Sequence, residues 1–212
     1  MPNLLLVDDH SMIRTGLMKF IETFLPHATF EEATDGDSAF EKIKQRDYDL
    51  IILDVNMPNT DSLGLVSNII ALKPKSKVLM FSMNAEEVYA TRYLKLGAMG
   101  YLRKDENDSE IQKAITNVLD NKKYISTSLT EKLLDDYSSD DKHQNPFDRL
   151  STREFEIVQH LSRGESLAGI CKKLNLHSST VGTHKARIFE KLGVTNVVEL
   201  NELAKAHNIL PG

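Results

Sequence analysis

Five residues with chemically active side chains each stand where an apolar segment ends. They are Asp8, Asp9, Asp54, Ser82 and Lys104. Two adjacent carboxylates repel each other, so Asp8 and Asp9 need water or a cation beside them. Clustered carboxylate oxygens without histidine or cysteine partners are the ligands that a hard cation such as Mg²⁺ prefers. If the fold brings these residues together, the sequence predicts a magnesium-binding site.

Each of the five residues also has an ordinary structural explanation. A single aspartate after a strand more often caps a helix or a turn than binds a metal, and Asp9 is placed to cap a helix that begins near Ser11. A single lysine after a strand is usually solvated. The coincidence of all five at segment ends is much harder to explain in this way, and we therefore favour a shared site.

The segments that carry these residues alternate between short apolar runs and amphipathic stretches. We expect five strands, at NLLLVD, ATFEEA, DLIILDV, KVLMFS and AMGYLR. We expect five helices, at about 11–24, 36–46, 62–72, 85–96 and 108–121, the last capped by Asp108. This alternation predicts an α/β fold with a doubly wound five-stranded parallel sheet. Working residues in such sheets gather beyond the carboxyl ends of the strands, where all five residues would lie.

Composition and charge indicate a globular protein with an acidic first part. The chain has 212 residues, of which 41% are hydrophobic and 27% charged, enough for one large or two small domains. It starts without a basic segment, and no apolar run approaches the ~18 residues of a membrane span, so we expect a cytoplasmic protein without a membrane contact. Residues 148–212 carry a net charge of +2, whereas the whole chain carries −5.

The second part carries the pattern of a helix-turn-helix. It follows a polar segment that is typical of a linker, YSSDDKHQNPFD. We expect a first helix capped by Ser151 or Thr152. A short helix at 166–174, a turn at Asn175 and a longer helix at about 179–192 follow. The second helix of such a pair typically enters the major groove of DNA.

The first part resembles the receiver domains of bacterial two-component response regulators over about residues 1–121. The resemblance rests on four segments in the same order and spacing, LLLVDDH, LDVNMPNTDS, VLMFS and GAMGYLRKD. It implies that Asp54 accepts a phosphoryl group from the phosphohistidine of a sensor histidine kinase. It further implies that Asp9 and Asp54 bind Mg²⁺ directly, Asp8 mainly through water, and Asn56 through its backbone carbonyl.

The same resemblance implies roles for three more residues. Lys104 would neutralise charge on the phosphoryl oxygens, and Ser82 would hydrogen-bond one of them. Tyr101 would turn inward after phosphorylation. The sequence departs from the family at Ser62, where glycine is frequent, and at Met83, where a small residue is frequent. Met83 is placed to crowd the entrance of the phosphorylation site and to alter transfer or hydrolysis rates.

The second part resembles the LuxR-type DNA-binding domain, and the whole chain is similar to response regulators of the NarL/LuxR type. The matching segments are LSTRE, TVGTHKARIFEKLGV and NVVELNELAKAHNIL, the last a fourth helix often used for dimerisation. The resemblance implies a receiver domain at 1–121, a linker at 122–147 with a helix at about 128–137, and a DNA-binding domain at 148–212. It implies a transcription regulator rather than an enzyme, which binds double-stranded DNA as a homodimer when phosphorylated.

The helix expected to enter the groove has an apolar face and an open face. At about 100° per residue, the apolar face carries Val181, Ile188 and Leu192. Lys185 falls on the same side and fits a snorkelling side chain, so Arg187 is expected as the main DNA contact, with Thr183 against bases. Gly182 and Ala186 stand where basic residues often reach DNA, which predicts a modest affinity. The predicted contact set is Thr180, Thr183, His184, Lys185 and Arg187.

Three other classes of protein share parts of this pattern. Haloacid-dehalogenase-type phosphatases also place Asp, Ser and Lys at strand ends around Mg²⁺, but they need a second aspartate as general acid where this chain has Asn56. A Rossmann dehydrogenase needs a glycine-rich loop after the first strand, and no such loop follows here. A receiver joined to a helix-turn-helix that serves protein contacts or a phosphorelay, and not DNA, stays open as the alternative.

Overall fold

The computed structural model describes residues 1–58, 60–131, 145–174, 176–207 and 209. The chain divides into two units, Met1–Glu131 and Lys132–Gly212, and each is described by itself. None of the described helices combines the length and the apolar character needed to cross a membrane. The turn predicted at Asn175 and most of the helix predicted at 128–137 lie outside the described residues.

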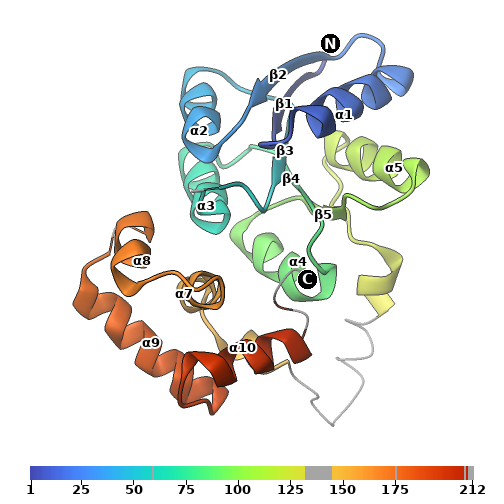
Figure 1. The fold of residues 1–212 in the computed structure, drawn as a ribbon. Helices are drawn as coiled ribbons and strands as arrows, with labels where there is room; N and C mark the ends of the chain where they lie inside the picture. The colour runs from blue at the N-terminus through green and yellow to red at the C-terminus, as the bar shows by residue number, and fades with distance from the viewer. Residues whose placement is uncertain (59, 132–144, 175, 208, 210–212) are drawn as a thin grey trace. The chain divides into compact units, whose positions relative to one another are not determined.

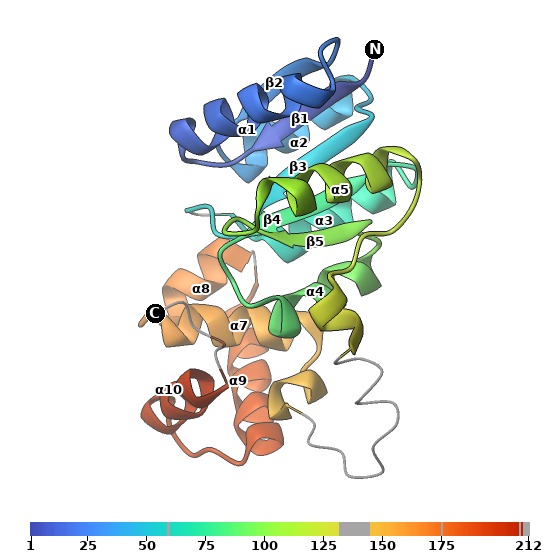
Figure 2. The same cartoon turned by 90° about the vertical axis from the view of Figure 1, so that its right-hand side faces the viewer.

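The first unit confirms the predicted five-stranded parallel sheet, with the strand order β2-β1-β3-β4-β5. The strands are β1 (Asn3–Val7), β2 (Thr29–Ala33), β3 (Leu50–Asp54), β4 (Val78–Ser82) and β5 (Gly100–Arg103). The helices that follow them are α1 (Ser11–Phe24), α2 (Gly36–Gln45), α3 (Ser62–Leu72), α4 (Glu86–Leu96) and α5 (Asp108–Leu119). Helices α1 and α5 cover one face of the sheet, and α2, α3 and α4 cover the other (Figures 1 and 2).

The apolar runs of the strands form the core because helices cover both faces of the sheet. All residues of β3 and β4 are buried, as are the residues of β1 after Asn3. Side chains of α1 and α5 pack on one face, among them Leu17, Ile21 and Ile115. The edge strand β2 keeps most of its residues at least partly exposed. The packed sheet therefore gives fixed positions to the residues that follow its inner strands.

Side-chain caps define where three helices of this unit begin. Asp35 and Asp61 accept hydrogen bonds from backbone N–H groups in the first turns of α2 and α3. The cap of α5 is Asn107 and not the predicted Asp108, which is the first residue of the helix. The prediction was wrong because both residues are good capping types, and the extended backbone at Asn107 selects that residue.

Residues 122–131 continue along the first unit. Tyr124 is buried, and its N–H donates to the Met99 carbonyl at 2.9 Å. The Ser126 hydroxyl donates to the buried Glu86 carboxylate at 2.5 Å. Leu129 is buried as well. The beginning of the segment predicted to link the domains is therefore packed against the sheet unit.

The described elements of the second unit are helical. They are the 3-10 helix η1 (Pro146–Arg149), α7 (Thr152–Ser162), α8 (Leu167–Leu174), α9 (Ser178–Leu192) and α10 (Val197–Ala206). Ser151 caps α7 in a capping box with Glu154, which confirms the predicted start. The core is formed by buried side chains from all five elements, including Phe147, Phe155, Ile170, Val181, Ile188 and Leu200. Helices α8 and α9 form the predicted helix-turn-helix pair.

Candidate functional site

Neighbouring strands deliver the functional residues of the first unit to one edge of the sheet. β1 lies beside β3, β3 beside β4, and β4 beside β5, all in parallel, so their carboxyl ends meet. Residues at or just after these ends are Asp8, Asp9, Asp54, Ser82 and Lys104. The fold therefore brings the predicted residues to one edge, because strand ends in a parallel sheet point the same way.

Lys104 joins two of the carboxylates. Its Nζ lies 2.5 Å from Asp8 Oδ2 and 3.0 Å from Asp54 Oδ2. The Lys104 side chain is 8% exposed and that of Asp54 is 3% exposed, so water screens these charges weakly. Burial raises the pKa of Asp54 more than the adjacent Lys104 ammonium lowers it. A cluster in which the aspartates stay charged therefore favours a further cation.

The acidic residues at this edge fit a metal ion. One ligand atom each from Asp8, Asp9, His10 and Asp54 lies within 4.8 Å of the others. Asp9 Oδ1 is buried and accepts no hydrogen bond from the described residues, although His10 Nδ1 lies 3.0 Å away. A buried carboxylate oxygen without a donor is costly, and a bound cation would satisfy it. The oxygen-rich donor set therefore fits Mg²⁺.

His10 is a member of the cluster that the sequence interpretation left out. Its Nδ1 also lies 3.3 Å from Asp8 Oδ1, and its side chain is 66% exposed. The expectation of carboxylates without a histidine neighbour is corrected by this contact. The adjacent position in the segment LLLVDDH was the available signal, but it did not reveal on which side of the turn the imidazole lies.

Asn84 connects the functional residues of three strands and was also missed. Its side-chain amide exchanges hydrogen bonds with that of Asn56, at 2.8 and 3.1 Å. Its N–H donates to Ser82 Oγ at 3.1 Å, and its carbonyl accepts from the Tyr101 hydroxyl at 3.2 Å. Burial raises the pKa of Tyr101 far above its ordinary value, so the phenol remains a hydrogen-bond donor. Nothing in the residue types around Asn84 distinguished it from an ordinary loop asparagine.

The two departures from the family lie in different environments. The Ser62 and Tyr93 hydroxyl oxygens are 2.8 Å apart and buried, so the hydroxyl at position 62 ties α3 to α4. Met83 is 58% exposed and lies at the surface directly after Ser82. The effect of Met83 on transfer or hydrolysis rates stays a prediction.

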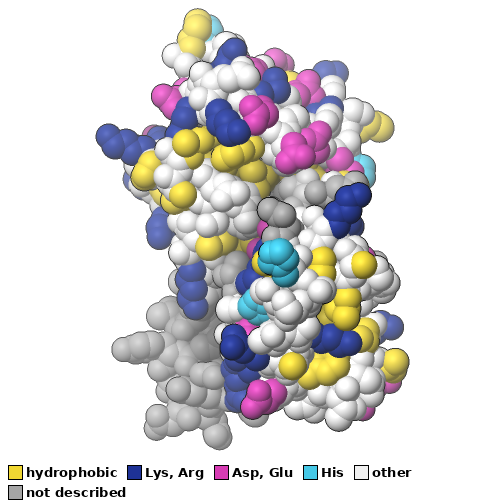
Figure 3. Space-filling view, turned by 90° about the vertical axis from the view of Figure 1, so that its left-hand side faces the viewer, with side chains coloured by type: hydrophobic (Ala, Val, Ile, Leu, Met, Phe, Trp, Pro, Cys, Tyr) yellow, Lys and Arg dark blue, Asp and Glu magenta, His cyan; other side chains and the backbone are white. Residues whose placement is uncertain are grey.

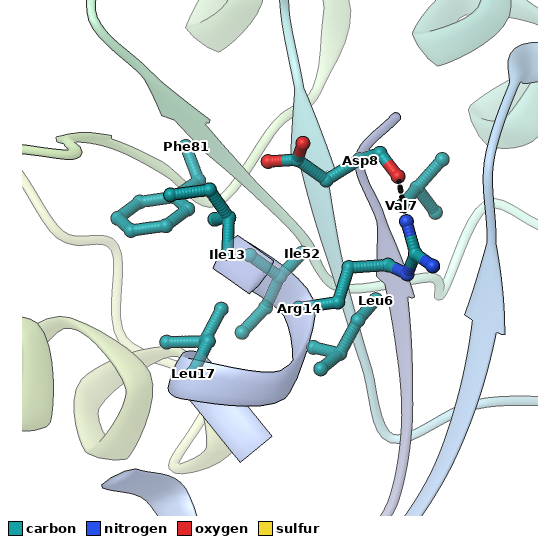
Figure 4. Close-up of a pocket in the computed structure, with 8 residues that line it drawn as sticks. All are labelled: Leu6, Val7, Asp8, Ile13, Arg14, Leu17, Ile52 and Phe81. Atoms are coloured by element: carbon teal, nitrogen blue, oxygen red, sulfur yellow. Dashed lines mark hydrogen bonds between the residues drawn. The ribbon is translucent and has the colours of Figure 1, made fainter. Parts of the chain in front are cut away.

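A small pocket lies beside the acidic cluster. Apolar side chains of β1, β3, β4 and α1 line it, together with Asp8 and Arg14 (Figure 4). Arg14 extends from α1 toward β1, where its Nη1 donates to the backbone carbonyl of Asp8 at 2.6 Å. A guanidinium group therefore contacts the turn that carries the acidic pair. The sequence interpretation did not single out Arg14.

The second candidate site is the open face of α9. The predicted apolar face is confirmed by the burial of Val181, Ile188 and Leu192. Thr183 and Arg187 are exposed, while Thr180 and Lys185 are half-buried. Lys185 Nζ lies 5.2 Å from the centre of the Phe189 ring. This contact keeps Lys185 at the edge of the core, where a snorkelling side chain was expected.

Few interactions within the protein engage the open face of α9. Arg187 makes no hydrogen bond or ion pair with any residue that the structure describes. The Thr183 hydroxyl donates to the Ser179 carbonyl at 2.9 Å, inside the helix. His184 is half-buried, and its Nδ1 finds no partner among the described residues. On the face of the molecule seen in Figure 3, Lys and Arg side chains occur in small separate groups, not in one continuous patch.

Both parts of the chain match known families. Residues 4–116 match the response regulator receiver domain, and residues 148–204 match the bacterial regulatory proteins of the luxR family. Response regulator GacA of Pseudomonas aeruginosa is 31% identical over 210 residues, which cover 99% of this chain and 98% of GacA. Response regulator UvrY of Escherichia coli is 29% identical over 209 residues, which cover 99% of this chain and 96% of UvrY.

Solved structures share the fold. RcsB from Salmonella enterica serovar Typhimurium, bound to promoter rprA in the presence of the phosphomimetic BeF3-, has a TM-score of 0.77 at 23% identity, over 97% of this chain and 100% of that chain. Because both family models and a full-length relative match in the order of the two units, the chain belongs to the two-component response regulators of the NarL/LuxR type, which are phosphorylation-controlled, DNA-binding regulators of transcription.

Proposed function

We propose that Asp54 accepts a phosphoryl group from the phosphohistidine of a sensor histidine kinase. One observation carries this assignment: Asp54 ends the central strand β3 and shares the Lys104 ammonium with Asp8. In the transfer, an oxygen of Asp54 forms a bond to phosphorus while the bond between phosphorus and the histidine nitrogen breaks. The products are an aspartyl phosphate on this chain and a free histidine on the kinase.

The protein groups around Asp54 suit this transfer. Such a reaction needs in-line positioning and neutralisation of charge on the phosphoryl oxygens. Lys104 would supply positive charge, and Ser82 Oγ would donate a hydrogen bond to one oxygen. Ser82 is already linked to the buried Tyr101 through Asn84. A movement of Ser82 toward the phosphoryl group would therefore change the contacts of Tyr101.

Mg²⁺ is the cation that we propose for the acidic cluster. Asp9 and Asp54 would bind it directly, Asp8 mainly through water, and Asn56 through its backbone carbonyl. The bound ion would neutralise negative charge on the transferring group. Two observations support this proposal: Asp9 Oδ1 is buried without a hydrogen-bond donor among the described residues, and ligand atoms of Asp8, Asp9, His10 and Asp54 lie within 4.8 Å of one another.

The second unit would bind double-stranded DNA through the open face of α9, as a homodimer of the phosphorylated chain. Arg187 would make the main contact because it is exposed and makes no ion pair with the described residues. With few cations on that face, two copies would be needed for useful affinity. We keep 1–121 as the receiver, 122–147 as the connecting segment and 148–212 as the DNA-binding domain, and we place the protein in the cytoplasm, where bacterial DNA lies.

A phosphodonor experiment tests the acceptor. The full chain should be labelled by acetyl phosphate in the presence of Mg²⁺, and Asp54→Asn should abolish labelling because asparagine cannot form the acyl phosphate. Asp37→Asn is the matched control, since Asp37 is an exposed carboxylate in the first turn of α2. Equal labelling of the Asp54→Asn protein at another residue would overturn the assignment.

A DNA-selection experiment tests the output. Phosphorylated and unphosphorylated protein would each select sites from random duplex DNA, and sedimentation would give their oligomeric states. We expect dimers and enriched two-fold symmetric sites after phosphorylation only. An unchanged oligomer together with unchanged DNA affinity would mean that phosphorylation is not the switch. A permanent dimer with phosphorylation-dependent DNA binding would refute only the dimerisation step.

A further inference from the structure

Arg14 occupies a position where the helix pattern calls for an apolar residue. It shares the inner face of α1 with Leu17 and Ile21, and its side chain is only 10% exposed. The neighbouring pocket wall is apolar (Figure 4). A guanidinium in such surroundings carries a desolvation penalty unless it is well paired. Its presence therefore needs an explanation beyond packing.

Two contacts compensate this penalty, and both fix the turn after β1. Arg14 Nη1 donates to the Asp8 carbonyl at 2.6 Å, and Arg14 Nε donates to Glu32 Oε2 at 2.5 Å. The planar guanidinium therefore ties the backbone of Asp8 to the neighbouring strand β2. A lysine, with one nitrogen, has no rigid fork that reaches both acceptors at once.

The remaining polar groups of Asp8 are held as well. Its N–H donates to the Ala33 carbonyl at 3.2 Å. Its Oδ1 accepts from the His10 N–H at 2.8 Å, and its Oδ2 contacts Lys104 Nζ at 2.5 Å. Figure 4 shows the carboxylate of Asp8 pointing away from the carbonyl that Arg14 contacts. Arg14 therefore holds the Asp8 carbonyl on the side opposite the Asp8 carboxylate.

We infer that Arg14 is a positioning residue for the metal site: by holding the Asp8 carbonyl, it sets the orientation of the turn that presents Asp8 and Asp9 to Mg²⁺. The inference rests on the proposed function, since it assumes that the acidic cluster binds Mg²⁺. Arg14 itself does not touch the ion. Its contact restrains the backbone of the turn before Mg²⁺ arrives. Without Arg14, Mg²⁺ binding would have to order the turn, and this would cost conformational entropy.

Electrostatics and positioning predict opposite signs for the removal of Arg14. A nearby cation repels Mg²⁺, so its charge alone would make binding tighter when Arg14 is removed. Loss of positioning makes binding weaker. Arg14→Met leaves Glu32 without its partner, but the Glu32 side chain is 41% exposed and can be solvated. The stability of the variant in EDTA therefore has to be measured beside its Mg²⁺ affinity.

The experiment measures Mg²⁺ affinity of the full chain by calorimetry, and free Mn²⁺ by electron paramagnetic resonance as an independent readout. We expect Arg14→Met to weaken binding by roughly tenfold, the lower end for partners that orient metal ligands. The Mg²⁺ affinity of Arg14→Lys should lie between those of the parent protein and Arg14→Met, because lysine can keep one of the two contacts of Arg14. Arg46→Met is the matched control: Arg46 pairs with Glu31 at an exposed site and should leave the affinity unchanged.

Acetyl phosphate labelling supplies a readout that a purely structural role would not move. The Mg²⁺ concentration for half-maximal labelling should rise with the loss of affinity in Arg14→Met, while the rate at saturating Mg²⁺ stays near that of the parent protein. Circular dichroism in EDTA checks that the variants are folded. If Arg14→Met does not fold, Arg14→Lys decides, and an unchanged half-saturation in that variant overturns the inference.

The possible outcomes separate the inference from the proposed function. Equal or tighter Mg²⁺ binding by Arg14→Met overturns the positioning role and leaves Asp54 phosphorylation untouched. A lower maximal labelling rate of Arg14→Met with an unchanged Mg²⁺ concentration for half-maximal labelling also overturns the positioning role. Absence of Mg²⁺ binding by the parent protein overturns the proposed metal site and the inference together.

Discussion

At the edge of the sheet that carries Asp8, Asp54 and Lys104, charged side chains contact one another inside the protein, whereas the open face of α9 leaves its side chains to solvent. Lys104 and Asp54 are nearly buried and 3.0 Å apart. Arg187 is exposed and has no ion-pair partner among the described residues. Charge at the first site is thus partly compensated within the chain, and the charge of Arg187 at the second site is left to solvent.

The difference fits the function that we propose for each site. A transferring phosphoryl group is small, so its surroundings act best when dipoles and charges are fixed before it arrives. DNA is large and supplies its own charge, so a reading helix needs an accessible face on a stable support. Substitutions at the first site should therefore change stability and chemistry together, whereas substitutions of exposed side chains on α9 should change DNA binding alone.

The largest effect is expected for Lys104→Met. Loss of the ammonium should lower the rate of acetyl phosphate labelling by about 100-fold, as for other fixed charge-stabilising groups. It should also lower the free energy of unfolding in EDTA by about 3 kcal/mol, since two buried carboxylates lose their shared cation. Lys113→Met, which removes half of an exposed ion pair with Glu110, is the control. If the free energy of unfolding of Lys104→Met in EDTA equals that of the parent protein, the sheet edge and α9 do not differ in the way described.

The next effect concerns Arg187→Ala. Binding to a selected operator should weaken by about 1–3 kcal/mol, and Lys185→Ala should cost less because Lys185 packs over Phe189. The free energy of unfolding should stay within about 0.5 kcal/mol for Arg187→Ala, as for other surface changes. Fluorescence anisotropy at fixed salt gives the affinities. A larger loss for Lys185→Ala would mean that the opposite side of α9 meets the DNA.

Gly182→Ala tests, with a smaller expected effect, whether the backbone of α9 approaches DNA. A Cβ at Gly182 would meet no atom within 4 Å, so alanine should stabilise the helix by about 1 kcal/mol. If the glycine serves close approach of the backbone to DNA, the same variant should bind the operator more weakly. Gly16→Ala in α1 is the control, since its Cβ would also meet nothing and it lies in the other unit. Stabilisation with unchanged operator affinity would exclude a backbone contact.

The smallest effect is expected at Glu154 of α7, whose carboxylate accepts a hydrogen bond from Lys191 of α9. Burial alone would raise the pKa of Glu154, but hydrogen bonds from Lys191 at 2.6 Å and from the Ser151 N–H at 2.8 Å lower it. A lowered carboxyl pKa stabilises the fold above the ordinary value of 4.5, and this contribution disappears as the pH falls through the lowered pKa.

Glu154→Gln isolates that charge because glutamine can still close the capping box. The variant should lose about 0.5 kcal/mol of stability at pH 7, and the difference from the parent should shrink below pH 4.5. Calorimetric melting at both pH values measures this, with Glu202→Gln at an exposed position as the control. A difference that persists at low pH would point to packing instead of charge.

The sequence by itself determined the elements and the edge where the chemistry lies. Apolar runs of strand length alternate with helical patterns, and this local information placed β1, β3 and β4 within one residue or so of their observed ends. Alternating strands and helices form parallel sheets with right-handed connections, so the carboxyl ends of all strands lie at one edge. Asp8 and Lys104 could therefore be placed together although they are 96 residues apart in the sequence. The apolar face of α9 followed from helical periodicity in the same way.

Only the tertiary structure decided which side chains support that edge. Arg14 lies on the face of α1 that the helical pattern makes apolar, and its contact with the Asp8 carbonyl depends on how α1 packs on β1. The pairing of Asn84 with Asn56 depends on loop conformations after two different strands. Polar contacts of this kind have no periodicity, because a single hydrogen bond depends on side-chain torsions and loop geometry, whereas burial is repeated along an element and leaves a pattern in the sequence.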